Sequence, residues 1–333
     1  MKRLRLPAIA LAVALLALAL AACGEKTDTT TGGAREPLSL TLDFYPNPDH
    51  AGIYMAQKRG YFEEAGLDVS IQTPSDPAAP IKQVAAGQTD LAISYEPEVL
   101  LAHEQGLNVI AVGALVDRPL TSLIWLKKSG IGGVAGLRGK TIATAGIPYQ
   151  DAYLKTILAR AKLTPSDVST VNVGYGLLPA LVGGRAQAML GGFSNVEGVD
   201  LKLRGKDPVV TPVDQLGVPS YDELVLVANR KKLEEDPQPV RLFLGALARG
   251  TAAAIEDPAA ATRALLAANS DLDPKLTGAE VAATLPALSR SGAMSPAKWK
   301  AFIAWMNRNE LIAHRPATSE VLSDEYLAGN VTG

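Results

Sequence analysis

Residues 42–54 of the chain, LDFYPNPDHAGIY, join a predicted strand to a predicted helix through a turn flanked by prolines. Apolar and polar residues alternate over 38–44, which is the period of a half-buried strand. Pro46 and Pro48 then interrupt the strand, and residues 51–64 carry apolar side chains at helical spacing. A strand that passes through a short turn into a helix is the starting unit of an α/β fold.

The same alternation of strand and helix continues along the chain. Short apolar runs predict strands at residues 67–72, 91–95, 108–115, 122–126, 140–143, 169–173, 186–191 and 223–228. Helical spacing predicts helices at residues 98–104, 148–161, 177–182, 240–255, 258–269, 278–288 and 296–309. In addition, Asp76 followed by Pro77 predicts a helix start, and Thr277 with Glu280 predicts a capping box that opens a helix.

Strands that alternate with helices predict an α/β protein with open, mainly parallel sheets covered by helices on both faces. Two such blocks fit the chain, one at about 38–122 and one at about 127–222. We expect the strand at 223–228 and the helices after it to return to the first block, so that two crossings between lobes make a hinged cleft. The expected lobes are therefore residues 38–125 plus 223–333 for lobe one and residues 126–222 for lobe two.

The N-terminal segment has the layout of an export signal. Basic residues at the start precede the uncharged, Ala- and Leu-rich residues 6–22, and Cys23 follows. The sequence LAAC at 20–23 resembles the bacterial lipoprotein box, in which the cysteine is lipidated and begins the mature chain. We therefore expect a signal peptide at 1–22, a lipid-anchored tether at 23–37 and a protein on the extracytoplasmic face of the cell membrane. The alternative is an uncleaved membrane anchor, because the uncharged run is nearly long enough to span a bilayer core of about 30 Å.

Composition excludes several classes of function. The chain has 333 residues, with 32 basic and 34 acidic side chains, so no positive excess exists to hold a nucleic acid. One cysteine and three scattered histidines exclude a disulfide framework and make a zinc site improbable, so we expect no metal and no cofactor. The sequence contains neither a G-x-S-x-G nucleophile motif nor a phosphate-binding loop. The sequence alone does not exclude a Ser-His-Asp triad, although no local motif supports one. An exported chain without metal or redox groups resembles a solute-capturing protein more than an enzyme.

Five segments together resemble one known family. They are residues 42–54, ISYEPE at 93–98, GIP at 146–148 with AYLK at 152–155, GGFSNVEGV at 191–199, and DQLGVPSYDEL at 214–224. They resemble the binding proteins of ABC importers for thiamine pyrimidine precursors. The wider superfamily includes binding proteins for riboflavin, alkanesulfonates, taurine and nitrate, and fungal-type enzymes that make the thiamine pyrimidine.

The resemblance implies a two-lobed periplasmic-binding-protein fold of type II, a flytrap, with the C-terminal helical segment packed on lobe one. It implies a monomer without enzymatic activity that binds a small heteroaromatic solute and delivers it to an ABC permease and its ATPase. The expected solute is an aminopyrimidine such as formylaminopyrimidine or hydroxymethylpyrimidine. The alternatives are riboflavin or an alkanesulfonate such as taurine, or, in another class, a pyrimidine-precursor synthase that uses His50.

The resemblance also implies which residues touch the solute. Phe44 would stack on an aromatic ring, and Glu197 would accept hydrogen bonds from the exocyclic amino group of an aminopyrimidine. Most of the family segments follow predicted strands, where open α/β sheets bind ligands. The remaining expected ligand-binding residues are Asn47, His50, Tyr95, Glu96, Tyr149, Gln150 and Asn195. For each of the nine, an ordinary turn, core or surface role is the alternative.

Overall fold

The computed structural model describes residues 34–329, and the residues from Glu36 onward form one compact unit. The expected signal peptide, the expected lipidation site Cys23 and nearly all of the expected tether lie outside the described residues. Within the described part of the chain, no helix is long and apolar enough to cross a membrane.

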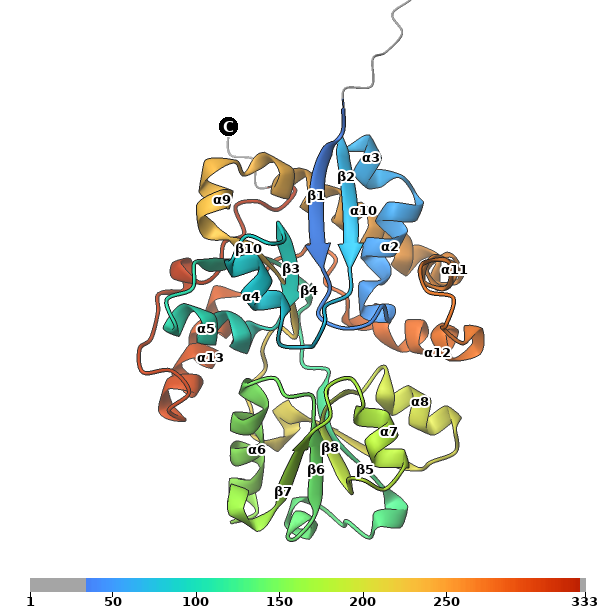
Figure 1. Ribbon diagram of the computed structural model, residues 1–333, viewed down its shortest axis with the longest axis vertical. Helices are drawn as coiled ribbons and strands as arrows, with labels where there is room; N and C mark the ends of the chain where they lie inside the picture. The colour runs from blue at the N-terminus through green and yellow to red at the C-terminus, as the bar shows by residue number, and fades with distance from the viewer. Residues whose placement is uncertain (1–33, 330–333) are drawn as a thin grey trace, which may run out of the picture. The chain divides into compact units, whose positions relative to one another are not determined.

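Two five-stranded sheets form the two lobes (Figure 1). The first sheet has the order β2-β1-β3-β10-β4, and the second has the order β7-β6-β8-β5-β9. The strands of the first sheet are β1 (Glu36–Thr41), β2 (Leu67–Gln72), β3 (Leu91–Ser94), β4 (Val109–Val116) and β10 (Leu224–Asn229). Those of the second are β5 (Thr121–Leu126), β6 (Thr141–Thr144), β7 (Ser169–Asn172), β8 (Ala188–Phe193) and β9 (Pro208–Pro212). The expected α/β architecture of two lobes is confirmed.

The sheets are mixed rather than mainly parallel, which corrects the prediction. Strand β1 runs parallel to β2 and β3, and β6 runs parallel to β7 and β8. However, β10 is antiparallel to β3 and β4, and β5 is antiparallel to β8 and β9. The reason is that β5 and β10 each follow a crossing from the other lobe, so they start at the edge of the sheet where their parallel neighbours end.

The crossings are the residues between β4 and β5 and those between β9 and β10. Because β5 already belongs to the second sheet, the expected lobe boundary after residue 125 falls near the end of this strand rather than before it.

Helices cover both faces of each sheet (Figure 1). The helices within the two α/β blocks are α2 (Ala51–Lys58), α3 (Tyr61–Glu64), α4 (Pro80–Ala85), α5 (Glu96–Glu104), α6 (Tyr149–Arg160), α7 (Leu177–Val182) and α8 (Glu197–Leu203). The C-terminal helices are α9 (Arg230–Glu235), α10 (Gln238–Glu256), α11 (Pro258–Ala268), α12 (Pro274–Thr284) and α13 (Pro296–Arg308). Sequence spacing did not predict α8, α9 or β9.

Three local predictions were wrong. The predicted helix at 51–64 breaks at Gly60, whose φ of 73° is left-handed and ends the helical ladder. Helix α4 begins at Pro80 rather than near Asp76, whose carboxylate instead accepts the backbone N–H of Ala78 in a turn.

The third error concerns the start of α12. Its cap is Asp273, which accepts the backbone N–H of Leu276, so Thr277 and Glu280 lie inside the helix and form no capping box.

The C-terminal helices pack on the first lobe, as expected. Helix α10 lies along α2, and the two backbones meet at Gly52 and Gly250. A Cβ on Gly250 would lie 2.2 Å from the carbonyl oxygen of Gly52, so only glycine allows this approach. Farther along, α12 packs against α8 of the second lobe, which brings the C-terminal segment to the boundary between the lobes (Figure 1).

Candidate functional site

A cavity of about 320 Å³ lies between the two lobes. This volume is within the range of small-molecule sites. Its walls come from the ends of β1, β3, β6 and β8, from the segments that follow these strands, and from α12 with the loop before it. Parallel strands that end at a common edge place the following loops around one crevice, which is why residues distant in sequence meet here.

Six of the nine predicted site residues line this cavity: Phe44, Asn47, Tyr95, Tyr149, Gln150 and Glu197. The other three, His50, Glu96 and Asn195, do not line it. Each of these three is buried and hydrogen-bonded to other parts of the protein.

His50 lies behind the cavity wall and holds Asp43. Its Nδ1 accepts the backbone N–H of Asn47 at 3.2 Å, so its Nε2 carries the proton and donates to Asp43 Oδ1 at 2.8 Å. The hydroxyl of Tyr95 donates to the other carboxylate oxygen of Asp43 at 2.9 Å. Asp43 itself lines the cavity. Sequence reasoning missed Asp43, although it lies beside Phe44 in the first family segment.

Glu96 begins α5 in the first lobe and binds the crossing between β9 and β10. Its Oε2 accepts the backbone N–H of Asp222 at 2.7 Å, and burial raises the pKa of Glu96 well above its usual value. Glu223, which follows Asp222 in the chain, connects the two crossings. Its carboxylate accepts the backbone N–H groups of Leu120 and Thr121 at 2.6 and 2.7 Å. These carboxylates therefore hold the hinge region rather than the cavity.

Asn195 connects the lobes beside the cavity. It lies in the second lobe between β8 and α8, and its Nδ2 donates to Asp49 Oδ1 at 2.8 Å and to Thr284 Oγ1 at 2.7 Å. Asp49 lies in the turn before α2, and Thr284 ends α12. Since Asn195 and its two partners belong to different lobes, this buried contact exists only while the lobes touch.

Aromatic rings gather on the first-lobe side of the cavity and reach across to the second lobe. The Phe44 ring meets that of Tyr175 edge-on, with centroids 4.6 Å apart and planes at 77°. The Tyr175 hydroxyl donates to the carbonyl oxygen of Pro74 at 2.9 Å. Deeper in the site, Tyr95 of the first lobe and Tyr149 of the second have centroids 5.5 Å apart. The cavity thus offers ring faces and edges from both lobes to a flat ligand.

Two polar groups of the second lobe are held in fixed positions. Glu197 begins α8, is half-buried, and accepts the backbone N–H of Phe193 at 2.7 Å; burial raises the pKa of its carboxyl. Gln150 Oε1 accepts the backbone N–H of Ala145 at 2.9 Å. Gly191 lies against this amide, since a Cβ there would lie 2.3 Å from Gln150 Nε2. Because Gly191 has no side chain, the Gln150 amide can occupy this position at the cavity wall.

Helix α12 and the loop before it form a wall that the sequence analysis did not assign to the site. Its lining residues are Asp271, Leu272, Asp273, Leu276, Thr277 and Glu280. Helical spacing predicted the helix, but spacing does not tell which side of a helix meets a second lobe. No cluster of His, Cys, Asp and Glu that could hold a metal ion occurs among residues 34–329.

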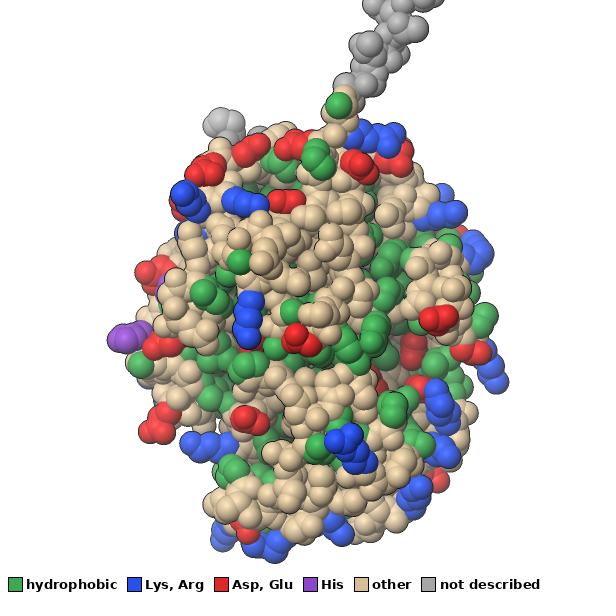
Figure 2. Space-filling view, viewed as in Figure 1, with side chains coloured by type: hydrophobic (Ala, Val, Ile, Leu, Met, Phe, Trp, Pro, Cys, Tyr) green, Lys and Arg blue, Asp and Glu red, His purple; other side chains and the backbone are tan. Residues whose placement is uncertain are grey.

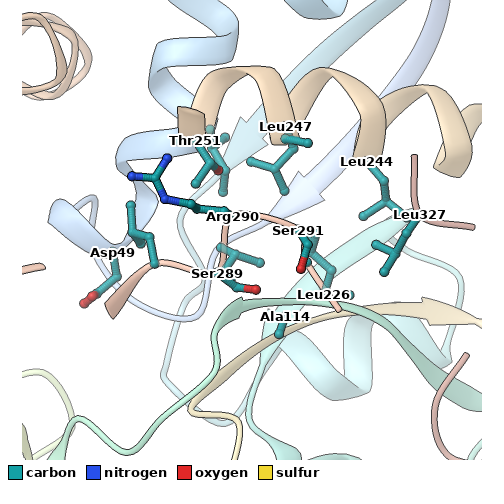
Figure 3. Close-up of a pocket in the computed structure, with 17 residues that line it drawn as sticks. Asp49, Ala114, Leu226, Leu244, Leu247, Thr251, Ser289, Arg290, Ser291 and Leu327 are labelled. Carbon is teal, nitrogen blue, oxygen red and sulfur yellow. The ribbon is translucent and has the colours of Figure 1, made fainter. Parts of the chain in front are cut away.

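A second pocket lies inside the first lobe (Figure 3). Leu244, Leu247 and Thr251 of α10 line one side of it, and Ala114 and Leu226 of the sheet line the other. Its volume of about 20 Å³ holds about one water molecule. This pocket is therefore too small for a solute, and the cavity between the lobes is the candidate site.

Solved structures share this fold. One is the alkanesulfonate-binding protein SsuA from Xanthomonas axonopodis pv. citri bound to MOPS, with a TM-score of 0.70, 17% sequence identity, and coverage of 87% of this chain and 99% of that one. Another is the CA3427 gene product of Candida albicans, which exhibits the generic periplasmic binding protein structural fold, with a TM-score of 0.65, 13% sequence identity, and coverage of 88% of this chain and 97% of that one. The expected two-lobed periplasmic-binding-protein fold is thereby confirmed.

Proteins related in sequence show to which family within this fold the chain belongs. The formylaminopyrimidine-binding protein of Halalkalibacterium halodurans is 33% identical over 96% of this chain and 98% of its own length. A protein of Haemophilus influenzae named for thiamine biosynthesis is 36% identical over 86% of this chain and 91% of its own length. A 4-amino-5-hydroxymethyl-2-methylpyrimidine phosphate synthase of Aspergillus parasiticus is 29% identical over 68% of this chain and 69% of its own length. The model of the family described as NMT1/THI5 like matches residues 47–261, and the chain belongs to this family.

Proposed function

We propose that this protein is the extracytoplasmic solute-binding component of an ABC importer and that it captures a thiamine pyrimidine precursor of the formylaminopyrimidine type. The observation that carries the proposal is the cavity between the lobes, which combines aromatic rings with fixed hydrogen-bond acceptors. The name of the relative from Halalkalibacterium halodurans supports the solute class. The permease and its ATPase would be the partners of a monomeric receptor.

The ring of the solute would lie against Phe44 and the tyrosines of the cavity. Its exocyclic amino group would donate to Glu197, whose carboxylate a backbone N–H already orients. An ionised acceptor shortens and strengthens such a bond. Phe44 and Glu197 belong to different lobes, so a bound solute would favour the closed arrangement because only there do both touch it.

An anionic solute such as an alkanesulfonate fits the cavity less well. The cavity is lined by the acidic side chains Asp43, Glu197, Asp271, Asp273 and Glu280, and by one basic side chain, Arg204. Arg204 is already paired with Asp200. A sulfonate would meet carboxylates without a free cation to balance them.

Catalysis by His50, as in a synthase, is also disfavoured. A histidine that is consumed in a reaction must reach the reacting molecule, whereas His50 is buried behind the cavity wall with both ring nitrogens hydrogen-bonded. A receptor would return its solute chemically unchanged.

The test is a thermal-shift panel on the chain from Gly24 onward, which keeps the whole compact unit from Glu36. The compounds are formylaminopyrimidine, 4-amino-5-hydroxymethyl-2-methylpyrimidine, thiamine, riboflavin and taurine. A ligand at about 100 times its dissociation constant stabilises the folded state by about 2.7 kcal/mol, which gives a readable shift. We expect a shift with the two pyrimidines. A shift with riboflavin or taurine alone, or recovery of a chemically altered pyrimidine, would refute the proposal.

A further inference from the structure

Glu280 is a buried acidic side chain that has no hydrogen-bonding or charged partner for its carboxylate among the described residues. It lies in the middle of α12, is 5% exposed and lines the cavity between the lobes. Its carboxylate makes no hydrogen bond and no ion pair with any residue that the structure describes. Burying an unpaired carboxylate costs free energy, so a residue of this kind inside a cavity indicates a partner that arrives with the ligand.

The other charged groups of the cavity are already engaged or lie on its rim. Asp43 holds His50 and Tyr95, and Asp273 caps α12. The single basic side chain, Arg204, is bound by Asp200. Acidic side chains are visible in a recess on the right-hand side of the space-filling view, among hydrophobic ones (Figure 2). Glu280 therefore has no positive neighbour within the cavity to compensate its charge.

Glu280 shares the cavity with a second carboxylate, that of Glu197. Helices α12 and α8 pack together, and Glu197 begins α8. Burial is the main cause that raises the pKa of Glu280 to about 8, and the charge of Glu197 is the next cause. Asp200 of α8 and Asp49 of the turn before α2 act in the same direction. The empty cavity therefore disfavours the ionised form of Glu280.

We propose that Glu280 and Glu197 form a paired acceptor that selects a solute whose end carries several N–H donors or a positive charge. This inference rests on the proposed function and adds to it a specificity-determining residue on the C-terminal helix. Two carboxylates can accept from an amidine-like edge, in which an amino group lies beside a protonated ring nitrogen, through charge-assisted hydrogen bonds. A phosphate or sulfonate at the same end would bring a third negative charge and be rejected, which is specificity by repulsion.

The variant Glu280→Gln tests this role, with Glu256→Gln as the matched control. Glu256 is the exposed last residue of α10, so its substitution makes the same change of charge away from the cavity. Affinity for formylaminopyrimidine is measured by calorimetry at pH 8.5, where Glu280 is mostly ionised. We expect Glu280→Gln to bind about 10- to 100-fold more weakly, as for the loss of one hydrogen bond to a charged group, and the control to bind as the wild type does.

The melting temperature of the empty protein is the second measurement. A ligand-selecting carboxylate destabilises the empty cavity, so Glu280→Gln should melt at the same temperature as the wild type or higher. A residue with a purely structural role would lower both melting temperature and affinity when replaced. Equal binding by Glu280→Gln and the wild type, or loss of affinity together with a lower melting temperature, overturns the inference.

A pair of probes separates this inference from the proposed function. Benzamidine is a flat cation with N–H donors, and benzenesulfonate is a flat anion of similar size. We expect the wild type to prefer benzamidine and Glu280→Gln to lose that preference, even if formylaminopyrimidine does not bind and the proposed function fails. Binding of neither probe, or a preference for benzenesulfonate, overturns the paired acceptor.

Discussion

Phe44 and Glu197 approach the cavity from opposite lobes, and their surroundings differ. Phe44 follows β1 and meets the ring of Tyr175, so it adds a ring face or edge without a fixed polar group. Glu197 begins α8 and is oriented by the backbone N–H of Phe193. Phe44 therefore contributes apolar contact area and shape to the cavity, whereas the Glu197 carboxylate contributes a hydrogen-bond acceptor with a fixed direction.

The substitution Glu197→Gln should weaken binding of formylaminopyrimidine by roughly 10- to 100-fold. The reason is that the amide keeps an oxygen for the N–H of Phe193 but loses the charge that strengthens the bonds to the solute. Calorimetry measures the affinity, and the melting temperature of the empty variant should stay near that of the wild type. Glu234→Gln on the exposed side of α9 is the control. Binding as tight as that of the wild type would show that Glu197 does not contact the solute.

The sequence indicated which loops surround the cavity, but not which side chain of a loop faces it. Phe44, Tyr95 and Glu197, which the family segments put forward as ligand-binding residues, line the cavity. The first of these segments also put forward His50, which does not line the cavity and instead holds Asp43. That choice depends on Tyr95, which is distant in sequence and donates to the same carboxylate. A contact of this kind cannot be read from spacing along the chain.

At the scale of elements, apolar runs in the sequence predicted most strands and helices. The reason is that a sheet covered by helices on both faces needs apolar side chains in its strands and in the helices that pack on it. The direction of β5 and β10 could not be predicted, since it depends on which lobe the chain has just left. The part that α12 plays in the cavity was missed for a related reason. Its position is set by α10 and α11, which connect it to the first lobe and bring it against α8.

The contact between α2 and α10 anchors the C-terminal helices and can be tested with two glycines of one helix. We expect Gly250→Ala to destabilise the protein by about 2 kcal/mol, because the new Cβ would overlap the Gly52 carbonyl oxygen at 2.2 Å and Ala56 Cβ at 2.6 Å. Gly245→Ala, with no atom within 4 Å, should stabilise it by up to about 1 kcal/mol through helix propensity. Urea unfolding measures both, and equal effects of the two substitutions would contradict this packing.

For the whole molecule, buried carboxyl groups determine how stability depends on pH. Burial raises the pKa of Glu98 to about 7 and that of Glu280 to about 8. In both cases the folded state binds a proton more tightly than the unfolded chain does. Their stabilising contribution is therefore present below about pH 4.5 and is lost as the pH rises through 7 to 8. We expect the melting temperature to fall between pH 5.5 and pH 8.5, and to fall less in Glu280→Gln; a rise over this range would contradict the burial of these groups.

Contact between the lobes also depends on a few buried polar groups. Asn195 makes direct hydrogen bonds from one lobe to the other. Its amide donates to Asp49 and to Thr284, so a single side chain of the second lobe holds two parts of the first. It does not line the cavity, and so it can stabilise a closed state without touching the solute. If the solute is released only when the lobes separate, removing this contact shifts the equilibrium towards the open state and speeds release.

The substitution Asn195→Ala should therefore increase the dissociation rate of formylaminopyrimidine several-fold, while the association rate changes little. Stopped-flow fluorescence with the intrinsic tryptophans measures both rates. Small-angle scattering of the empty protein should show a larger radius of gyration for the variant than for the wild type. Asn309→Ala at the end of α13 is the control, because the Asn309 amide donates to the carbonyl oxygen of Trp305 in the same helix, away from the cavity. An unchanged dissociation rate would mean that Asn195 serves local packing alone. A slower association rate with unchanged dissociation would instead place Asn195 on the path by which the solute enters.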